Sequence, residues 1–352
     1  MGFKKMITED GPVGLEDIAK NTGVAVSTVS RALRDMPGIH PETRLKVLRE
    51  AELLGYNSRP RKSEVSPSGT RHILILTVGE ETPTRYMAGL SRAALSLNAS
   101  LHHHFATREE SEELLVPKNL PLCLRHELIT GIILVYRWPE KIVEKIHARY
   151  PAISIVHTYQ DTALDVIGID HAGGMHALVK HLKAAGHQQI GFVGLDPRVS
   201  WSRSRFAGYL EGLLAMGLRV PLESLVQLDL ACLTREISHM VDQVTAGLAK
   251  GVRAWVCADD FIGYEVCSEL MRRGIRIPED VAITGFHRHM HVRHGNMPQL
   301  TSTEVDGELM GDNALRQLVH RMEHPREGPR LILMPASFFQ GQTTPQPEAS
   351  SL

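Results

Sequence analysis

The sequence lacks the features of a membrane-spanning or disulfide-stabilised protein. No apolar run approaches the roughly 18–20 residues that a helix needs to cross a bilayer. The basic first residues are not followed by the apolar stretch of a signal peptide. The four cysteines, Cys123, Cys232, Cys257 and Cys267, show no CxxC spacing, which favours reduced thiols over disulfides. We therefore expect a soluble protein of the cytoplasm.

The sequence also lacks the short motifs of several large enzyme classes. It contains no GxGxxG or GxxxxGK[ST] pattern for nucleotide phosphates, no HExxH pattern for catalytic zinc and no GxSxG pattern for an activated serine. We therefore predict that the protein is not an enzyme, has no catalytic residues and needs no cofactor.

Histidine is abundant, with 19 residues, but its spacing does not favour a metal site. The run His102–His104 would alternate between the two faces of a strand, so neighbouring members would not chelate together. A second cluster between residues 287 and 294 has no cysteine or carboxylate near it, whereas zinc sites need three or four ligands at defined spacing. We expect surface or loop histidines and no metal.

The 352 residues are 43% hydrophobic and 22% charged, a composition that suits a globular protein of two or three domains at roughly 100–200 residues each. Charge is distributed unevenly. Residues 1–62 hold 11 Lys and Arg against 8 Asp and Glu, while the remaining residues hold 28 against 32. A small basic unit on a larger acidic body favours contact of the N-terminal unit with a polyanion.

Residues 15–55 carry the apolar spacing of three short helices. One stripe begins at Leu15, and a second runs from Val26 to Leu33 after a short turn. A third helix is expected from Pro41, because proline suits a first helical turn. Two short helices joined by a tight turn and followed by a third form a helix-turn-helix pattern.

The second of these helices has the composition of a DNA-reading helix. Its apolar positions face inward, which leaves hydrophilic side chains exposed: Ser27, Thr28, Ser30, Arg31 and Arg34. Small hydroxyls and arginines can bond phosphates and base edges in a major groove. The competing interpretation is an ordinary hydrophilic surface helix.

Beyond a linker between residues 57 and 71, which is rich in Pro, Gly, Ser and basic residues, the pattern changes. Short apolar runs, such as 73–78, 131–135 and 254–257, alternate with helical stretches of ten to eighteen residues. Fully apolar strands alternating with helices predict parallel sheets covered on both faces. The length of this region favours two such subdomains.

Several segments closely resemble the LacI/GalR family of bacterial transcription regulators. In the N-terminal unit they are LEDIA at 15–19, TGVAVSTVSRAL at 22–33 and ETRLKVL at 42–48. In the body they include GIDHAGG at 168–174, RFAGY at 205–209, CADD at 257–260, GIRIPEDVAITGF at 274–286 and PQLTS at 298–302. The motifs occur in the family's order and span nearly the whole chain.

The resemblance implies a fold: an all-α helix-turn-helix headpiece and an α/β body of two Rossmann-like lobes, similar to a periplasmic binding protein. We predict an N-terminal extension at 1–14, the headpiece at 15–57, a hinge at 58–71, an effector-binding and dimerisation body at 72–344 and a disordered tail at 345–352. Within the body, the N-lobe is expected at 72–167 and 301–329, and the C-lobe at 168–298 and 332–344.

The resemblance also assigns DNA contacts in the headpiece. Val26, Ser27 and Arg31 match positions that read base edges, although Val26 is equally suited to a half-buried site. Arg34 stands where a further polar contact is usual. The phosphate-facing positions are Leu15 (through its backbone region), Thr22, Ser30 and Thr43.

In the hinge, the family's usual Ala-Arg-x-Leu element is altered. Lys62 and Ser63 replace the Ala-Arg pair, and Val65 stands in the place of the leucine that wedges into the minor groove. Valine is shorter and β-branched, so we expect a weaker wedge and less DNA kinking. The alternative is a hinge that stays flexible with Val65 unengaged.

The resemblance places an effector between the lobes, and Arg205 matches the family's effector-binding arginine. Asp259 and Asp260 follow a predicted strand at its carboxyl end, where open α/β sheets bind ligands, although a helix N-cap is a competing role, above all for Asp260. His287 and Arg288 replace acidic residues that are usual there, which disfavours a purely polyhydroxy ligand held by carboxylates and tolerates an anionic one such as a sugar acid or phosphate.

Three aromatic residues near predicted strand ends, Tyr136, Trp138 and Trp201, are expected to stack on a sugar ring or base, or simply to pack. Glu80 and Glu81 are further candidates. We predict a DNA-binding transcriptional regulator, a repressor acting as a homodimer on double-stranded, pseudo-palindromic operator DNA. Its effector would be a carbohydrate or sugar acid, with a nucleobase as second choice. The alternative is a stand-alone metabolite-binding protein whose headpiece no longer binds DNA.

Overall fold

Two units, Met1–Glu64 and Val65–Leu352, make up the chain. The computed structural model describes residues 14–33, 38–54, 56, 69–79, 84–116, 119–220, 222–229, 233–288 and 297–346. The predicted DNA-contacting residues Arg34, Lys62 and Val65 lie outside these ranges, as do Glu80 and Glu81.

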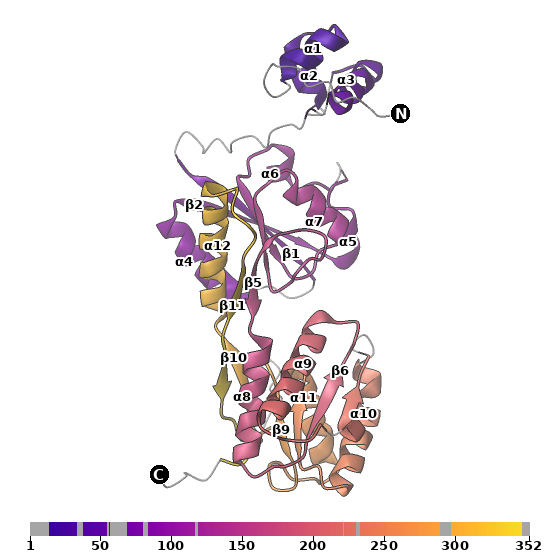
Figure 1. Ribbon diagram of the computed structural model, residues 1–352, viewed down its shortest axis with the longest axis vertical. Coiled ribbons are helices and arrows are strands. Elements are labelled where there is room, and N and C mark those ends of the chain that lie inside the picture. The colour runs from indigo at the N-terminus through magenta and orange to yellow at the C-terminus, as the bar shows by residue number, and fades with distance from the viewer. Residues whose placement is uncertain are drawn as a thin grey trace. The chain divides into compact units, whose positions relative to one another are not determined.

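The headpiece is the predicted all-α helix-turn-helix unit (Figure 1). Its helices are α1 (Leu15–Thr22), α2 (Val26–Leu33) and α3 (Pro41–Leu53). Helix α1 ends at Gly23, whose φ of 70° is a left-handed conformation that favours glycine. Ile18, Val29 and Val47, one from each helix, are buried together in a small apolar core. The inward-facing positions that periodicity predicted for α2 are therefore confirmed.

The N-lobe of the body is built on a six-stranded sheet in the order β11-β5-β4-β3-β1-β2, and all of its strand pairs are parallel. Its strands are β1 (Arg71–Val78), β2 (Ala99–Ala106), β3 (Gly131–Val135), β4 (Ala152–Ile155), β5 (Asp165–Ile169) and β11 (Leu331–Met334). Its helices are α4 (Thr84–Ser96), α5 (Arg108–Glu112), α6 (Leu122–Arg125), α7 (Glu140–His147) and α12 (Gly307–Glu323).

Alternate residues of β1 enter different cores, which explains why its sequence is continuously apolar. Ile73 and Ile75 pack on the side of α4 and α12, whereas Leu74 and Leu76 pack on the side of α6 and α7. A strand buried on both faces has no polar face to display.

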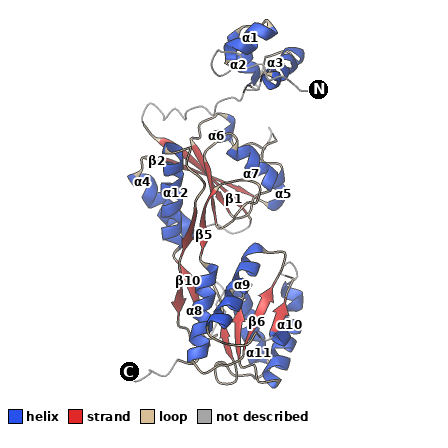
Figure 2. Cartoon of the chain, in the orientation of Figure 1, coloured by secondary structure: helices blue, strands red, loops and turns tan. Residues whose placement is uncertain are grey.

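The C-lobe has a four-stranded parallel sheet in the order β7-β6-β8-β9. Figure 2 shows the strands of this lobe among its helices. Its strands are β6 (Ile190–Leu195), β7 (Leu225–Gln227), β8 (Ala254–Cys257) and β9 (Ala282–Thr284). Its helices are α8 (His171–Ala184), α9 (Ser200–Ala215), α10 (Leu233–Ala249) and α11 (Asp260–Arg272), with a short 3-10 helix at Leu222–Ser224. Trp255 of β8 is fully buried in this lobe.

The chain crosses between the lobes three times. One crossing runs from β5 into α8, and the others run through β10 (Ser302–Val305) and β12 (Ala336–Phe339), which pair antiparallel. The lobe boundaries differ from those expected. We assigned the chain from 168 and from 332 onward to the C-lobe, but β5 extends to Ile169 and Leu331–Met334 pairs with it as the edge of the N-lobe sheet. Residues 342–344 do reach C-lobe neighbours, because the Thr343 hydroxyl accepts from the backbone N–H of Thr301 and donates to the carbonyl of Ile283.

Candidate functional site

The exposed face of α2 carries the predicted base-reading side chains. Val26 is 41% exposed, and Ser27 and Arg31 are exposed as well, whereas Val29 and Ala32 of the same helix are buried. Val26 is therefore available at the start of the helix. The α2 surface combines one apolar contact with hydroxyl and guanidinium donors, as a major-groove helix needs.

The other headpiece positions differ in how they meet solvent. Leu15, Ser30 and Thr43 are partly exposed, as is Thr28. Thr22 is buried, and its hydroxyl donates to the carbonyl of Ile18 at 2.5 Å. The Thr22 side chain therefore closes the end of α1, which leaves its backbone as the part suited to a phosphate.

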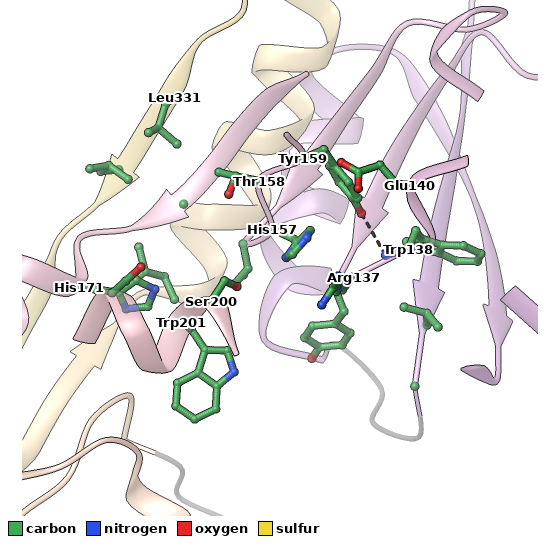
Figure 3. Close-up of a pocket in the computed structure, with 18 of the residues that line it drawn as sticks. Arg137, Trp138, Glu140, His157, Thr158, Tyr159, His171, Ser200, Trp201 and Leu331 are labelled. Atoms are coloured by element: carbon green, nitrogen blue, oxygen red, sulfur yellow. Dashed lines mark hydrogen bonds between the residues drawn. The ribbon is translucent and has the colours of Figure 1, made fainter. Parts of the chain in front are cut away.

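A cavity of about 1040 Å³ lies between the two lobes of the body. The carboxyl ends of β1, β3, β4 and β5 border it from the N-lobe, and the first turn of α8 and residues 200–211 of α9 border it from the C-lobe. Figure 3 shows Arg137, His157 and Tyr159 on the N-lobe side and His171 and Trp201 on the C-lobe side. The position agrees with the general location of ligands at strand carboxyl ends in open α/β sheets.

Arg205 of α9 is the centre of a hydrogen-bond network behind the C-lobe wall of this cavity. Its side chain is 5% exposed. Nη1 donates to the carbonyl of Ala258 at 2.7 Å and to Oδ2 of Asp259 at 3.0 Å, and Nε donates to Nδ1 of His171 at 3.3 Å. Arg205 thus ties together the beginnings of three C-lobe helices: α8, α9 and α11.

Two aromatic rings enclose the same guanidinium group. Its carbon lies 4.6 Å from the centre of the Trp201 ring and 4.2 Å from that of Phe286, both within the range of cation–π attraction. Burial lowers the pKa of Arg205, and the Asp259 carboxylate opposes that shift. Arg205 nevertheless stays charged, because an arginine is effectively always protonated in proteins.

The two neighbouring aspartates have separate roles. Asp259 is the N-cap of α11, since its Oδ1 accepts from the backbone N–H of Phe261 at 2.9 Å while Oδ2 binds Arg205. Asp260 is buried, and its Oδ1 accepts from the Ser302 hydroxyl at 2.6 Å. The cap that we expected above all for Asp260 therefore belongs to Asp259.

His287 and Arg288 turn toward the crossover strands. Both have positive φ angles, 92° and 45°. The Arg288 guanidinium pairs with Glu304 of β10 and lies 3.9 Å over the ring of Phe339. Neither residue lines the cavity between the lobes as bounded by the described residues. In this arrangement their backbone carbonyls accept hydrogen bonds from Arg85, an N-lobe residue, at 3.2 Å each.

The three predicted aromatic residues also separate. Trp138 is 1% exposed, and its indole N–H donates to the carbonyl of Leu76, so most of the ring belongs to the N-lobe core. All three residues line the cavity, but only Tyr136 and Trp201 are partly exposed. Packing is therefore the main role of Trp138 in this arrangement, whereas the other two are placed for ligand contact.

The His102–His104 run lies on β2 and alternates as expected. Nε2 of His102 is 3.1 Å from Nδ1 of His72, whereas Nε2 of His103 is 2.8 Å from the hydroxyl of Thr77. Among the residues that the structure describes, no three His, Cys, Asp or Glu side chains group as metal ligands. No described helix is long and apolar enough to span a membrane.

Comparison with known proteins agrees with these features. Residues 14–58 match the bacterial regulatory proteins of the lacI family, and residues 179–344 match a periplasmic binding protein-like domain. The transcriptional repressor CytR of Escherichia coli (strain K12) is 23% identical over 327 residues, covering 90% of this chain and 93% of CytR. The chain belongs to the LacI family of transcriptional regulators.

Two solved structures show the same fold. The Lac repressor dimer bound to operator and the anti-inducer ONPF aligns with a TM-score of 0.63 at 22% identity, covering 95% of this chain and 99% of that one. The complex of the regulator CelR with cellobiose aligns with a TM-score of 0.65 at 23% identity, covering 94% and 99%. The predicted fold class is thus confirmed: a helical LacI headpiece and two parallel-sheet lobes of the periplasmic-binding-protein type.

LacI-family regulators act by binding and not by catalysis, which confirms the non-enzymatic prediction on the basis of the family. This regulator also has cleft residues that the sequence analysis missed. Arg137, His157 and Tyr159 line the N-lobe side of the cavity. Arg137 comes two residues after β3 and His157 two residues after β4, so the strand-end rule applied to Asp259 would have found both.

His157 and Tyr159 form a second polar cluster on that side. Burial lowers the pKa of His157, as does the nearby Arg137, while Glu140 opposes the shift. Burial raises the pKa of Tyr159 to about 12. The Tyr159 hydroxyl accepts from the backbone N–H of Trp138 at 3.0 Å. Both side chains are therefore neutral near pH 7 and present hydrogen-bonding groups without charge.

Proposed function

We propose that this LacI-family regulator is a repressor that binds a pseudo-palindromic operator as a homodimer, and that a small molecule bound between its lobes changes operator affinity. The observation that carries the effector half of the proposal is the cavity of about 1040 Å³ that both lobes line. A ligand that contacts two lobes differently in two arrangements shifts the equilibrium between them. Because its target is chromosomal DNA, we place the protein in the cytoplasm, at the nucleoid.

The DNA half rests on the exposed face of α2. Val26 offers a methyl contact for thymine, Ser27 a hydroxyl and Arg31 a bidentate donor for guanine. One headpiece with so few base contacts gives modest affinity, whereas two headpieces in register reach the affinity typical of specific sites. This requirement supports a dimer, and the Lac repressor in the similar solved structure is a dimer on its operator.

The hinge contacts remain a prediction. Lys62 and Val65 lie outside the described residues. We propose that the hinge orders on DNA, with Lys62 at a phosphate and Val65 as a weaker minor-groove wedge than leucine. Arg34 keeps its proposed polar contact on the same sequence grounds.

For the effector we propose a carbohydrate or sugar acid, with a nucleobase as second choice. Trp201 and Tyr136 provide aromatic surface that stacks on sugar rings, and the wall around them is rich in hydrogen-bonding groups. The related CelR structure contains cellobiose. His287 and Arg288 remain candidate contacts for an anionic group only if the corner after β9 rearranges, because Arg288 is paired with Glu304 here.

The DNA half is tested with Arg31→Ala and its matched control Arg49→Ala, which removes the same charge from an exposed position on α3. Arg31→Ala is expected to weaken operator binding by about 1–3 kcal/mol and to relax base preference at one position in each half-site. Arg49→Ala is expected to keep the base preference. Fluorescence anisotropy with operator variants at several salt concentrations measures both.

Unchanged base preference in Arg31→Ala would contradict the assignment of α2. Weak, salt-dependent binding of the parent protein to every sequence would instead favour a metabolite sensor without an operator. The effector half is tested by isothermal titration of the parent protein with sugars, sugar acids and purines, followed by operator binding with each ligand that binds.

A further inference from the structure

The Arg205 network leaves one of its members in contact with the cavity. Arg205 is itself 4% exposed, and its Nη1 and Nε atoms are already donating to protein acceptors. Asp259 divides its two oxygens between Arg205 and the α11 backbone. His171 differs, because its ring borders the cavity beside Trp201 (Figure 3).

The contact with Arg205 determines where the His171 ring carries its proton. The Nε–H of Arg205 points at Nδ1 of His171 at 3.3 Å. An arginine nitrogen has hydrogens and no free lone pair to accept with, so Nδ1 must be the acceptor and must lack a proton. The neutral ring therefore carries its hydrogen on Nε2.

The surroundings also keep this ring uncharged. It is packed 5.6 Å from the Phe286 ring, centre to centre. Burial lowers the pKa of His171 to about 3, and the Arg205 cation beside it lowers the pKa in the same direction. A second proton would have to sit on Nδ1, facing the guanidinium group. His171 is thus a neutral donor with a fixed orientation over the whole physiological pH range.

We propose that His171 is a specificity-determining residue of the effector site, donating from Nε2–H to an acceptor atom of the effector, and that Arg205 positions it. Among the described residues, Nε2 has no hydrogen-bond partner of its own. The effector therefore presents an acceptor, such as a carboxylate, carbonyl, ring or hydroxyl oxygen, to the start of α8. This inference rests on the proposed effector cleft.

A site built around one donor discriminates strongly against ligands that do not satisfy it. A ligand with an N–H at this position would face a second donor, and a ligand with a methyl group would leave Nε2–H buried and unpaired. Both lose affinity, because an unsatisfied buried donor carries its full desolvation cost. Arg205 also donates to the carbonyl of Ala258 and to Asp259, and these bonds hold its guanidinium group in place. A fixed guanidinium group keeps the His171 ring from turning.

The first experiment needs no effector. Nitrogen-15 NMR of the histidine rings, with His171→Gln used to assign the signal, reports which ring nitrogen carries the proton. We expect the Nε2–H form of His171 with no titration between pH 5 and 8, and a change of tautomer or appearance of exchange in Arg205→Gln. A ring that titrates near the ordinary pKa of about 6.5, or an Nδ1–H form, would overturn the proposal.

The second experiment measures binding of the tightest ligand among D-glucose, cellobiose, D-gluconate, D-glucose 6-phosphate and adenine. Glutamine places an N–H close to where Nε2 lies, so His171→Gln is expected to retain affinity within about threefold. His171→Phe keeps the ring and removes the donor, and it is expected to lose about tenfold to a hundredfold. His176→Gln, on the same helix but outside the cavity, is the matched control and should not change affinity.

Equal affinity of His171→Phe and the parent protein would show that His171 is only a packing residue. That result would leave the cleft and its response to ligand intact, so it is distinct from failure of the proposed function. If the parent protein binds no member of the panel, the proposed effector class is wrong, and this inference fails with it.

Discussion

Among the arginine–aspartate pairs of the described body, two have both side chains largely buried, one in each lobe, and they lie at opposite ends of their sheets. In the N-lobe, Arg321 binds Asp165 at the first residue of β5. In the C-lobe, Arg205 binds Asp259 just beyond the last residue of β8. The cavity lies at the carboxyl end of the N-lobe strands, so the first pair is at the opposite end of its strand, whereas the second pair is bonded to His171, which lines the cavity.

In the N-lobe pair, both carboxylate oxygens of Asp165 are fully occupied by hydrogen bonds within the protein. Both oxygens of Asp165 are bonded to Arg321, at 2.7 and 2.9 Å, and they also accept from Gln317 and from the backbone N–H of Arg330. The carboxylate has no lone pair direction left for a ligand. It joins α12, β5 and the segment that leads into β11, and its role is to hold these parts of the lobe together.

In the C-lobe pair, the arginine divides its hydrogen bonds between the aspartate and other acceptors. A single nitrogen of Arg205 reaches Asp259, while a second one orients His171 toward the cavity. A buried ion pair is therefore not by itself evidence of a functional site. What distinguishes the two pairs is their position relative to the strand ends and the presence of a neighbour that still has a donor to offer.

We expect the largest effect, a loss of stability, from breaking the N-lobe pair. Asp165→Ala leaves the Arg321 guanidinium, which is 12% exposed, without its carboxylate, and is expected to lower the free energy of unfolding by about 3–5 kcal/mol. Urea unfolding followed by circular dichroism measures the change. Asp312→Ala, which breaks a more exposed pair with Arg316, is the control and should cost less than about 1 kcal/mol. A similar small cost for Asp165→Ala would erase the distinction between structural and surface pairs.

Breaking the C-lobe pair should affect effector binding more than stability. Arg205→Ala removes the group that orients His171 and the ion-pair partner of Asp259, so effector affinity is expected to fall at least tenfold, or about 1.4 kcal/mol. The free energy of unfolding of Arg205→Ala should fall less than that of Asp165→Ala, because Asp259 is 16% exposed and keeps its helix-cap bond. Isothermal titration and urea unfolding of the same samples give both numbers. Unchanged effector affinity would remove Arg205 from the site altogether.

A smaller effect is expected in the pH dependence of stability. Burial by itself would raise the pKa of Asp165, but hydrogen bonds from Arg321, Gln317 and the Arg330 backbone outweigh it and lower the pKa. Its unfolded form therefore takes up a proton first as the pH falls. The stabilisation is complete above the ordinary pKa of about 3.9 and is lost as the pH falls through the lower folded value.

The comparison of parent and Asp165→Asn isolates this contribution. The free energy of unfolding of the parent protein should decline more steeply than that of Asp165→Asn between about pH 5 and pH 2, because asparagine does not titrate in this range. Parallel curves would mean that Asp165 has the same pKa in both states. Effector affinity measured in Asp165→Asn at pH 7 should match that of the parent, in keeping with the distance of this pair from the cavity.

Some of the site was accessible from sequence reasoning and some was not. Arg205 and Asp259 lie in the RFAGY and CADD motifs, Trp201 lies near a predicted strand end, and the structure brings the three together. Trp138 was placed in the cleft by strand-end reasoning, and it does line the cavity, but its ring is 1% exposed and packs mainly in the N-lobe core. The direction in which a side chain points after a strand depends on the backbone of the loop that follows. Tyr136, two residues before Trp138, has a positive φ of 65°, which the apolar spacing of the sequence does not predict.

The sequence by itself determined the kinds of elements, their order and the helix-turn-helix, since these depend on apolar spacing and on turn and cap residues within a few positions of each other. Only the tertiary structure decided which distant segments meet: that β11 joins β5 in the N-lobe sheet, that Arg321 serves Asp165, and that His171 is held by Arg205. Such pairings are set by the closure of long loops and by the requirement that every buried charge and donor find a partner. A local pattern carries no information about which partner lies at the other end of the loop.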